Sequence, residues 1–332
     1  MRSAKHLWPA VASPEALDHA WRKARRGKRY RASAARFELD AETELRRLLE
    51  ELEGGSYRPG RHRLIFLREP KRRVIAAAPF RDRVVHHAVH EVLEPILARS
   101  FLDDSFACRP GKGTQRAILQ HVALSRNHRF RQHVDVRAFF ASVDLDQSFA
   151  LVAQRVRDPR FLDLLSAILE GGLRVYRDPA ALAYLSLERP TGDRRGLPIG
   201  NLTSQLLANA YLDGVDHFIK RELRVRGYVR YMDDLTLFGN DAARLEEQTN
   251  EVRDWLAANR GLTLKPGAGP RPSVEPTTFL GCLVSPEGAR LSESLLARIG
   301  RKAARLSNDP VRLERALGSW RALGASISAF GG

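Results

Sequence analysis

Apolar residues near the start of the chain recur every three to four positions, over residues 14–25 and again over residues 45–52. This period places them on one face of a helix. Ser13 is a residue type that often precedes the first turn of a helix, and Gly54 is one that often follows the last turn. We therefore expect two helices here. The basic stretch 22–31 between them has two open interpretations, a hydrated helix end or an RNA contact.

From residue 64 onward, short β-prone runs alternate with helical runs. The predicted elements are strands over 64–67, 74–77 and 130–136, hairpins over 229–238 and 279–290, and helices over 82–98, 202–223, 242–259, 293–306 and 310–325. No stretch of about 18 apolar residues occurs, so we expect no contact with a membrane. With 332 residues, the chain is long enough for an α+β fold with more than one substructure.

The charge balance of the chain indicates a polyanionic partner. Lys and Arg number 55 against 39 Asp and Glu, which gives a formal net charge of +16. Such a charge attracts a phosphate backbone, although surface charge also keeps proteins dissolved. The two cysteines, Cys108 and Cys282, lie far apart with no Cys or His at metal-ligand spacing, so neither a zinc site nor a disulfide framework is expected. A reducing cytoplasm is the expected location.

Two adjacent acids interrupt an apolar, β-prone run at residues 229–238. A tight hairpin would bring Asp233 and Asp234 to its turn. Neighbouring carboxylates in a buried turn repel one another and lose hydration, which is unfavourable unless a cation is bound. An ordinary solvated turn is the alternative interpretation, and Asp103-Asp104 is a candidate for such a turn in the same chain.

A third acid, Asp135, comes at the end of the apolar strand predicted before it and is followed by Phe139-Phe140. This pattern resembles the first catalytic motif of reverse transcriptases, and Tyr231-Met-Asp-Asp234 resembles their second, the YMDD motif. The motifs stand in the family's order, with a glycine-rich segment and a long predicted helix between them. The resemblance, over about residues 37–283, implies a right-hand polymerase fold with fingers, palm and a short helical thumb. It also implies an RNA-directed DNA polymerase, a nucleotidyltransferase.

The resemblance also implies two bound Mg²⁺ ions, with Mn²⁺ as an alternative. In that arrangement Asp135 and Asp233 bridge the ions, Asp234 supports them, and the carbonyl of Val136 is a further ligand. Oxygen ligands of this kind suit Mg²⁺, and a two-ion site suits nucleotide addition. Asp144, beyond the aromatic pair, is expected to cap the following helix instead.

Phe140, Lys71 and Arg73 are assigned by the resemblance to the incoming nucleotide. Phe140 falls where the family carries an aromatic ring that excludes a ribose 2′-hydroxyl; core packing is its alternative role, and Phe139 is expected to pack in the core. Lys71 and Arg73 alternate along a predicted strand, so both would project to one face and contact phosphate oxygens, while Arg72 points away. Ordinary solvated charge is the alternative for this pair.

The segment before the long helix separates types of reverse transcriptase. Many relatives carry Gln-Gly, three residues and Ser-Pro there, whereas this chain has Ile199 for the glutamine and Gln205 for the proline. That pair resembles the polymerases of diversity-generating retroelements. These enzymes copy a template-repeat RNA with frequent errors at adenines, a process called mutagenic retrohoming. Ile199 and Gln205 are therefore added to the expected nucleotide site.

Two further segments are assigned by resemblance. Tyr231 and Met232 are expected near the primer and template, and Phe279-Leu280-Gly281 resembles the primer-grip hairpin, with core packing as the alternative for Phe279. Where relatives continue with a Lys-Lys-Thr string, this chain has glycine and alanine at 267–269. The lysine expected to protonate pyrophosphate therefore has no clear equivalent, and whether Lys265 replaces it stays open.

The resemblance divides the chain into an N-terminal helical and basic segment (1–60), fingers (61–130), a palm with part of the fingers interleaved (131–285) and a thumb (286–332). The implied partners are template RNA, the cDNA or primer, dNTPs and a small basic accessory protein. Two alternatives remain. One is a retron-like or antiviral (abortive-infection) reverse transcriptase, of which the antiviral kind extends DNA without an external template. The other is an inactive polymerase fold kept as an RNA-binding scaffold.

Overall fold

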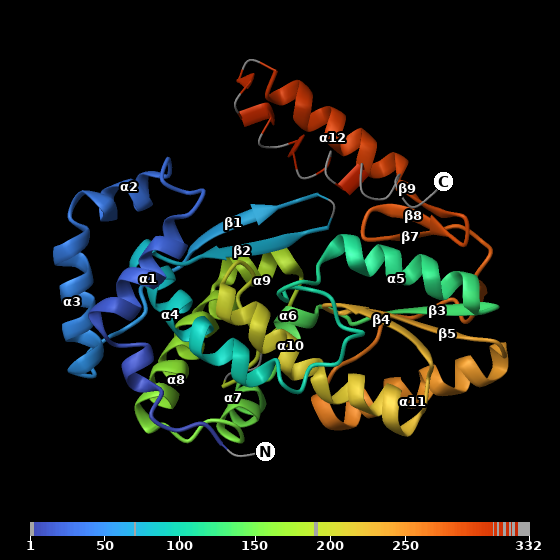
Figure 1. Ribbon diagram of the computed structural model, residues 1–332, viewed down its shortest axis with the longest axis horizontal. Coiled ribbons are helices and arrows are strands. Elements are labelled where there is room, and N and C mark those ends of the chain that lie inside the picture. The colour runs from blue at the N-terminus through green and yellow to red at the C-terminus, as the bar shows by residue number, and fades with distance from the viewer. Residues whose placement is uncertain are drawn as a thin grey trace. The chain divides into compact units, whose positions relative to one another are not determined.

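The structure is a computed structural model that describes residues 3–69, 71–188 and 192–307, together with 309, 310, 312–314, 317, 318, 320, 323 and 324. The chain forms two compact units, and it passes between them more than once (Figure 1). Unit 1 comprises Met1–Phe101, Ala138–Asp213 and Arg260–Leu262, and unit 2 comprises Leu102–Arg137, Gly214–Asn259 and Thr263–Gly332. Each unit is described below by itself.

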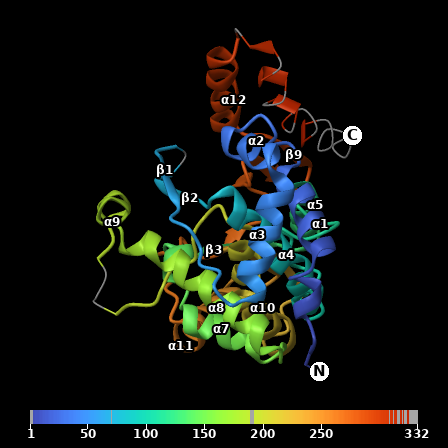
Figure 2. The same cartoon turned by 90° about the vertical axis from the view of Figure 1, so that its left-hand side faces the viewer.

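Unit 1 is mainly helical, and its N-terminal helices pack as their sequence pattern predicts (Figure 2). The apolar face of α1 buries Leu17 and Ala20 and packs against α3 and α4. Ser13 caps α1 by accepting a hydrogen bond from the N–H of Ala16. The elements of unit 1 are η1 (Trp8–Ala10), α1 (Pro14–Arg25), α2 (Ala32–Leu39), α3 (Ala41–Glu53), β1 (Arg63–Leu67), β2 (Arg73–Ala77), α4 (Phe80–Leu97), α6 (Phe139–Ser142), α7 (Leu145–Ala153), α8 (Pro159–Leu173), η2 (Arg174–Arg177), α9 (Pro179–Leu185) and most of α10 (Leu202–His217).

The β1–β2 hairpin of unit 1 packs on a small core that also fixes the loop before α10. The core includes Val74 and Ala76 of β2 and the buried ring of Tyr176. Gly196 adopts a φ of +122°, and a Cβ atom at this position would lie 2.2 Å from the Tyr176 ring. Because a side chain at Gly196 would collide with the ring, glycine is needed for this close approach.

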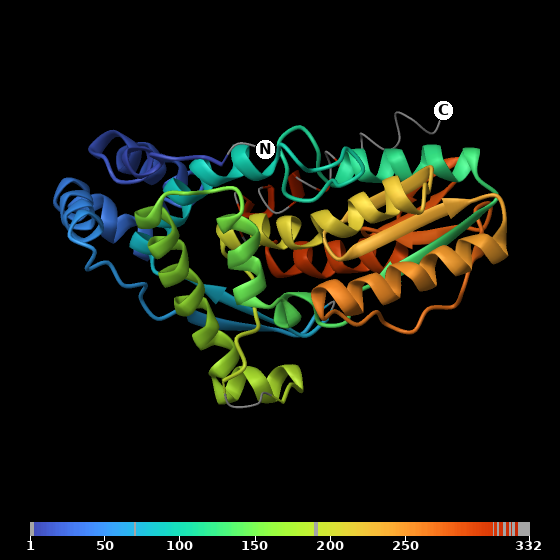
Figure 3. The ribbon, with the colours of Figure 1, turned by 90° about the horizontal axis from the view of Figure 1, so that it is seen from below.

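Unit 2 contains a four-stranded sheet in the order β4-β5-β3-β6 and a three-stranded sheet in the order β7-β8-β9. Figure 3 shows α5 and α11 on opposite faces of the four-stranded sheet. α5 also packs against β8 and β9 of the second sheet. The elements are α5 (Thr114–Asn127), β3 (Phe130–Asp135), the π-helix η3 (Phe218–Glu222), β4 (Gly227–Tyr231), β5 (Asp234–Gly239), α11 (Ala242–Arg260), β6 (Arg271–Pro272), β7 (Thr277–Phe279), β8 (Cys282–Ser285), β9 (Gly288–Leu291) and α12 (Glu293–Arg305).

Both faces of the four-stranded sheet are covered, which explains the continuous apolar run of β5. Val229 and Phe238 pack with Phe279 and residues of α5 in one buried cluster. On α11, the hydroxyl of Thr249 donates to the side-chain carbonyl of Gln132 on β3, with an O···O distance of 2.9 Å. A strand covered on both faces reads as a near-continuous apolar segment.

The structure confirms most of the predicted elements and corrects two of them. The helix predicted over 202–223 ends at His217 and continues as the π-helix η3, and the hairpin predicted over 279–290 is part of a three-stranded sheet. α5 and α8 were not predicted. The helix predicted over 310–325 lies partly outside the described residues. In the described part of the chain, no helix is both long and apolar enough to cross a bilayer.

Candidate active site

Strand register gathers the three predicted acids at one end of the four-stranded sheet. Asp135 is the last residue of β3 and Asp234 is the first of β5, and the two are direct partners across the antiparallel pair. Side chains of direct partners lie on the same face of a sheet. Asp233 occupies the turn between β4 and β5, and its carbonyl accepts a hydrogen bond from the N–H of Val136, with an N···O distance of 3.4 Å.

The turn that carries Asp233 has an uncommon backbone conformation. Met232 adopts a φ of +59°, in the left-handed region. For a residue other than glycine such a conformation costs about 1–3 kcal/mol, and it persists where neighbouring groups hold it. The carbonyl of Met232 accepts a hydrogen bond from the guanidinium of Arg230, and the Met232 side chain is buried.

Lys265 lies beside Asp135 and contacts it through both its side chain and its backbone. Its ammonium forms an ion pair with the Asp135 carboxylate. Its backbone N–H donates to the Asp135 carbonyl, with an N···O distance of 2.9 Å, and Leu264 bridges Val136 in an antiparallel pairing. His133 lies two residues before Asp135 on β3, and its Nδ1 is 3.1 Å from an Asp234 carboxylate oxygen. Basic side chains therefore neighbour two of the three acids.

The acids suit a divalent ion by their donor chemistry and by their register. Carboxylate oxygens are the ligands that Mg²⁺ prefers. No group of three or more His, Cys, Asp or Glu side chains among the described residues is arranged as a metal cage. The Asp135 carboxylate is instead matched by the Lys265 ammonium, so a cation already stands beside this acid. A bound ion would be held by Asp135, Asp233 and Asp234, and at Asp135 it would compete with Lys265.

In unit 1, Phe140 and Phe139 lie in the short helix α6 and differ in burial. Phe139 is fully buried, which confirms its predicted place in the core, and Phe140 is half-buried. The two rings meet edge to face with centroids 5.4 Å apart. The carbonyl of Phe140 accepts a hydrogen bond from the N–H of Leu197, with an N···O distance of 2.7 Å. This bond fixes Phe140 to the loop that leads to Ile199.

Ile199 lies beside β2 in unit 1. Its carbonyl accepts a hydrogen bond from the N–H of Ala76, with an N···O distance of 2.8 Å, and its backbone bridges Ile75. The next residue, Gly200, has a φ of +113°, and a Cβ atom there would lie 3.0 Å from the Ile75 side chain. Gln205 is half-buried in the first turns of α10. Phe140, Ile199 and β2 are thus connected through backbone bonds of one loop.

The structure separates the two cations that were assigned to phosphate. Arg73 is the first residue of β2 and is exposed. Lys71 is exposed in a bend before the strand, so the prediction that both alternate along one strand is wrong for Lys71. The guanidinium of Arg72 lies over the ring of Tyr184, 5.7 Å from its centroid.

The residues assigned to primer and template lie in unit 2. The hydroxyls of Tyr231 and Thr114 are hydrogen-bonded at 2.9 Å. Phe279 is fully buried, with its ring centroid 4.7 Å from that of His121, a core position as its alternative interpretation expected. Leu280 and Gly281, with φ angles of +51° and +84°, form the turn between β7 and β8.

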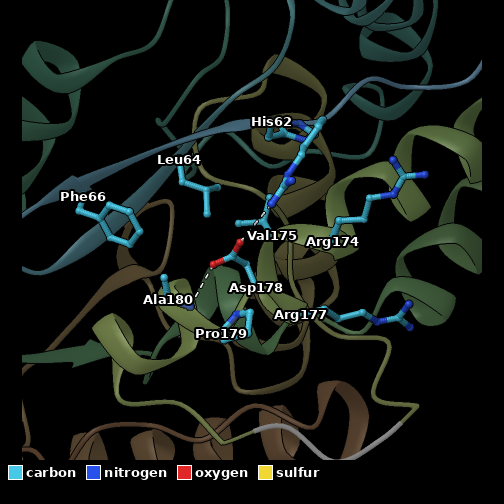
Figure 4. A pocket seen from close by; sticks show the side chains of 10 residues that line it. His62, Leu64, Phe66, Arg174, Val175, Arg177, Asp178, Pro179 and Ala180 are labelled. Atoms are coloured by element: carbon cyan, nitrogen blue, oxygen red, sulfur yellow. Dashed lines mark hydrogen bonds and ion pairs between the residues drawn. The ribbon is translucent and has the colours of Figure 1, made fainter.

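A pocket of about 570 Å³ in unit 1 is lined by residues that the sequence did not single out (Figure 4). Arg61, Arg174 and Arg177 supply three cations to its lining. The carboxylate of Asp178 caps α9 by accepting hydrogen bonds from two backbone N–H groups, and it lies 3.9 Å from Arg61. The lining therefore has more positive than negative charge.

Sequence reasoning missed an ion pair beneath the YMDD turn. Arg230 and Asp216 are both fully buried, and Asp216 lies in the last turn of α10. A charged residue inside an otherwise apolar strand was the available signal, since an unpaired buried charge is strongly unfavourable. The acidic pair 103–104 is also only partly a solvated turn, because Asp104 is half-buried and lies 3.5 Å from the Lys220 ammonium. Asp144, by contrast, caps α7 as predicted by accepting from the N–H of Gln147.

Comparison with known proteins identifies the family. A sequence profile described as "Reverse transcriptase (RNA-dependent DNA polymerase)" matches residues 68–267, more than half of the chain. The chain belongs to the reverse transcriptase family. Its match contains all three acids as well as Phe140, Ile199 and the YMDD turn.

Several curated proteins are similar over about half of this chain. The uncharacterized 91 kDa protein in cob intron of Schizosaccharomyces pombe is 29% identical over 165 residues, 50% of this chain and 19% of that protein. The group II intron-encoded protein LtrA of Lactococcus lactis subsp. cremoris is 24% identical over 54% of this chain and 28% of its own length. Protein YkfC of Escherichia coli is 26% identical over 53% and 45%. The chain thus spans less than half the length of these relatives.

Among solved structures, a telomerase from Candida albicans in complex with a fragment of telomeric RNA is similar over 82% of this chain and 55% of that chain. The sequence identity is 10% and the TM-score is 0.48.

Proposed function

We propose that the chain is an RNA-directed DNA polymerase that adds deoxynucleotides to a primer at Asp135, Asp233 and Asp234. The observation that carries this proposal is the register that pairs Asp135 with Asp234 and sets Asp233 in the adjoining turn. Membership of the reverse transcriptase family supports the same reaction. The formal net charge of +16 suits a nucleic-acid substrate.

The three acids would hold two divalent ions, with the Val136 carbonyl as a further ligand. Such ions activate the primer 3′-hydroxyl and neutralise charge on the triphosphate and the departing pyrophosphate. Lys265 neutralises Asp135 in the present state. With a divalent ion bound at Asp135, the Lys265 ammonium would be able to contact a phosphate oxygen instead. Tyr231, Met232, Leu280 and Gly281 remain the proposed primer and template contacts.

In unit 1, the proposed nucleotide contacts are Phe140, Ile199 and Gln205, with Lys71 and Arg73 toward the triphosphate. The ring of Phe140 would exclude a ribose 2′-hydroxyl by contact. Ile199 can supply contact area and shape but no side-chain hydrogen bond. The division into fingers, palm and thumb at 61–130, 131–285 and 286–332 belongs to the same proposal.

The finer proposal is a polymerase of a diversity-generating retroelement in the cytoplasm, with a small basic accessory protein as partner. Ile199 and Gln205, at positions where many relatives carry glutamine and proline, support it. A gene neighbourhood that contains a template repeat and a near-identical variable repeat is the expected finding. A neighbourhood without such repeats would remove this assignment and leave the general one.

Primer extension tests the general proposal and its alternatives together. Purified protein is incubated with Mg²⁺, the four dNTPs and a defined RNA annealed to a DNA primer, and the products are sequenced. The expected product is DNA complementary to the RNA. Product of unrelated sequence, formed equally well without RNA, would favour the template-free antiviral reading. Tight RNA binding with no product under any of these conditions would favour the inactive scaffold.

A further inference from the structure

The ion pair of Arg230 and Asp216 lies beneath the turn that carries Asp233. Both side chains have an exposed fraction of 0%. Nε of Arg230 donates to one Asp216 oxygen at 2.7 Å and a terminal nitrogen donates to the other at 2.6 Å. This two-point contact fixes the orientation of the planar guanidinium, which a single contact would not do.

The remaining terminal nitrogen of Arg230 reaches the YMDD turn. It donates to the carbonyl of Met232, with an N···O distance of 3.1 Å. Met232 is the residue with the left-handed φ of +59°, and Asp233 follows it directly. The peptide that accepts this bond therefore joins Met232 to Asp233. Arg230 thus connects a fixed anion in the core to the backbone of a proposed metal ligand.

Neighbouring groups hold the ion pair on both sides. The hydroxyl of Tyr228, two residues along the same face of β4, donates to Asp216 at 2.8 Å. The backbone N–H of Arg230 donates to the carbonyl of Asp104, and its carbonyl accepts from the N–H of Phe106. These bonds leave Arg230 little freedom to move.

A buried ion pair of this kind is weak support for stability as such. Apolar residues of similar volume commonly stabilise a core equally well, because the pair must lose its hydration. A role in geometry explains Arg230 better, since an apolar side chain could not donate to the Met232 carbonyl.

We propose that Arg230, oriented by Asp216 and Tyr228, is a positioning residue that holds the Met232–Asp233 peptide so that Asp233 can bind a divalent ion. This inference rests on the proposed polymerase function. It concerns affinity for the ion and the rate of nucleotide addition. RNA affinity is not expected to depend on Arg230. Arg230 is fully buried and would act only through the backbone of the turn.

Arg230→Lys is the informative variant, because it keeps the buried positive charge opposite Asp216 but loses the planar fork. Side chains that orient metal ligands typically change affinity or activity by about 10–100-fold when altered. We expect the half-saturating Mg²⁺ concentration for primer extension to rise about tenfold and the turnover to fall similarly. KM for dNTP at saturating Mg²⁺ and the Kd for RNA are expected to change less than twofold.

Arg131→Lys is the matched control. Arg131 is also a buried arginine of the same sheet that donates to a backbone carbonyl, that of Pro272 at 2.6 Å. It lies at the far end of β3 from Asp135. Its variant is expected to lose thermal stability as Arg230→Lys does while keeping the wild-type Mg²⁺ dependence. Equal Mg²⁺ dependence in wild type, Arg230→Lys and Arg131→Lys would show that Arg230 is merely structural.

Mn²⁺ binding, followed by electron paramagnetic resonance, separates failure of this inference from failure of the proposed function. Wild type with no Mn²⁺ bound at the acids, matching Asp233→Asn, would overturn the proposed function. Wild type that binds Mn²⁺ and Arg230→Lys that binds it as tightly would overturn the positioning role alone. If Arg230→Lys fails to fold, Tyr228→Phe takes its place, because it removes only the hydroxyl bond to Asp216. It is expected to weaken Mn²⁺ binding about twofold to threefold, and unchanged binding would overturn the inference.

Discussion

The acids at the end of the four-stranded sheet and the cations of the β1–β2 hairpin differ in how the chain supports them. In unit 2, Asp135 and Asp234 are fixed by strand register, and the turn between β4 and β5 is bonded to a buried arginine. In unit 1, Arg73 is exposed at the start of β2, and Lys71 is exposed in the bend before it.

The difference agrees with the ligand that is proposed for each group. A metal site depends on ligand positions to within a few tenths of an ångström, so its backbone is held by buried bonds. Phosphate contacts from long, exposed cations tolerate displacement, because charge attraction falls off slowly with distance. Changes at the sheet end should therefore act on catalysis sharply, and changes at the hairpin should act gradually.

The largest effect is expected for Asp233→Asn. It removes the charge of a proposed ion ligand, so primer extension should fall by about a hundredfold or more, while the fold and RNA affinity stay unchanged. Steady-state extension, circular dichroism and RNA binding measure the three properties. Asp254→Asn, at an exposed acid of α11, is the control. Near wild-type extension by Asp233→Asn would contradict the catalytic assignment.

Phe140→Ala tests the half-buried ring of unit 1. The ring is proposed to exclude a ribose 2′-hydroxyl, so its removal should lower discrimination against ribonucleotides by about tenfold to a hundredfold. Single-turnover incorporation of dNTP and rNTP measures this ratio. Phe140→Tyr keeps the ring and should keep the discrimination. Unchanged ratios in both variants would assign Phe140 to core packing.

The double variant Lys71→Ala/Arg73→Ala addresses the hairpin directly. Loss of two exposed cations should raise KM for dNTP about tenfold and change turnover little, because the acids are unaffected. The matched control removes two exposed arginines of α3, Arg46 and Arg47. If both double variants raise KM equally, general charge and not a phosphate contact is responsible.

Ile199→Gln tests the finer proposal. A glutamine amide could hydrogen-bond the nucleotide or its pair, so misincorporation at template adenines should fall several-fold more than at other bases. Sequencing of cDNA made from one RNA by wild type, Ile199→Gln and the shape-conserving Ile199→Val gives the comparison. Equal adenine error rates in three active enzymes would remove Ile199 from the site.

The smallest expected effect concerns acid stability of the unit 2 core. Burial, with contributions from Arg131 and His133, lowers the pKa of His121 to about 3. Below about pH 6.5, His121 binds a proton in the unfolded chain but not in the folded chain. The free energy of unfolding that His121 contributes above that pH is therefore lost as the pH falls toward 3. Each such group contributes at most about 1.4 kcal/mol per pH unit.

His121→Phe should reduce this loss between pH 7 and pH 5, as measured by urea unfolding. His19→Gln, at an exposed histidine of α1, serves as the control. An unchanged pH dependence in His121→Phe would show that His121 does not contribute to acid sensitivity.

Much of the fold was predictable, because periodicity and caps are local properties of the sequence. Strand register was not, and it is register that makes Asp135 and Asp234 partners. Lys265 illustrates the limit. Its alignment with relatives was ambiguous, and only the pairing of Leu264 with Val136 places it at Asp135.

Long-range partners explain the other omissions. Arg230 is a charged residue inside an apolar strand, but its partner Asp216 comes from a helix that precedes the strand, so the sequence did not reveal the pair. Similarly, the sequence left open whether Phe279 packs in the core, and its burial beside His121 became known only from the structure. Burial depends on what covers a residue, and the local pattern does not contain that information.

The ion pair of Lys265 with Asp135 gives a proposed metal ligand a counter-charge that does not come from a metal. Small zinc-binding domains cannot fold until their metal arrives, because metal binding supplies the free energy of folding. Here the counter-charge is encoded in the chain itself. We therefore expect the chain to reach its folded state in a chelating buffer with little free metal. Under the proposed function, metal supply would limit the activity of the enzyme and not its folding.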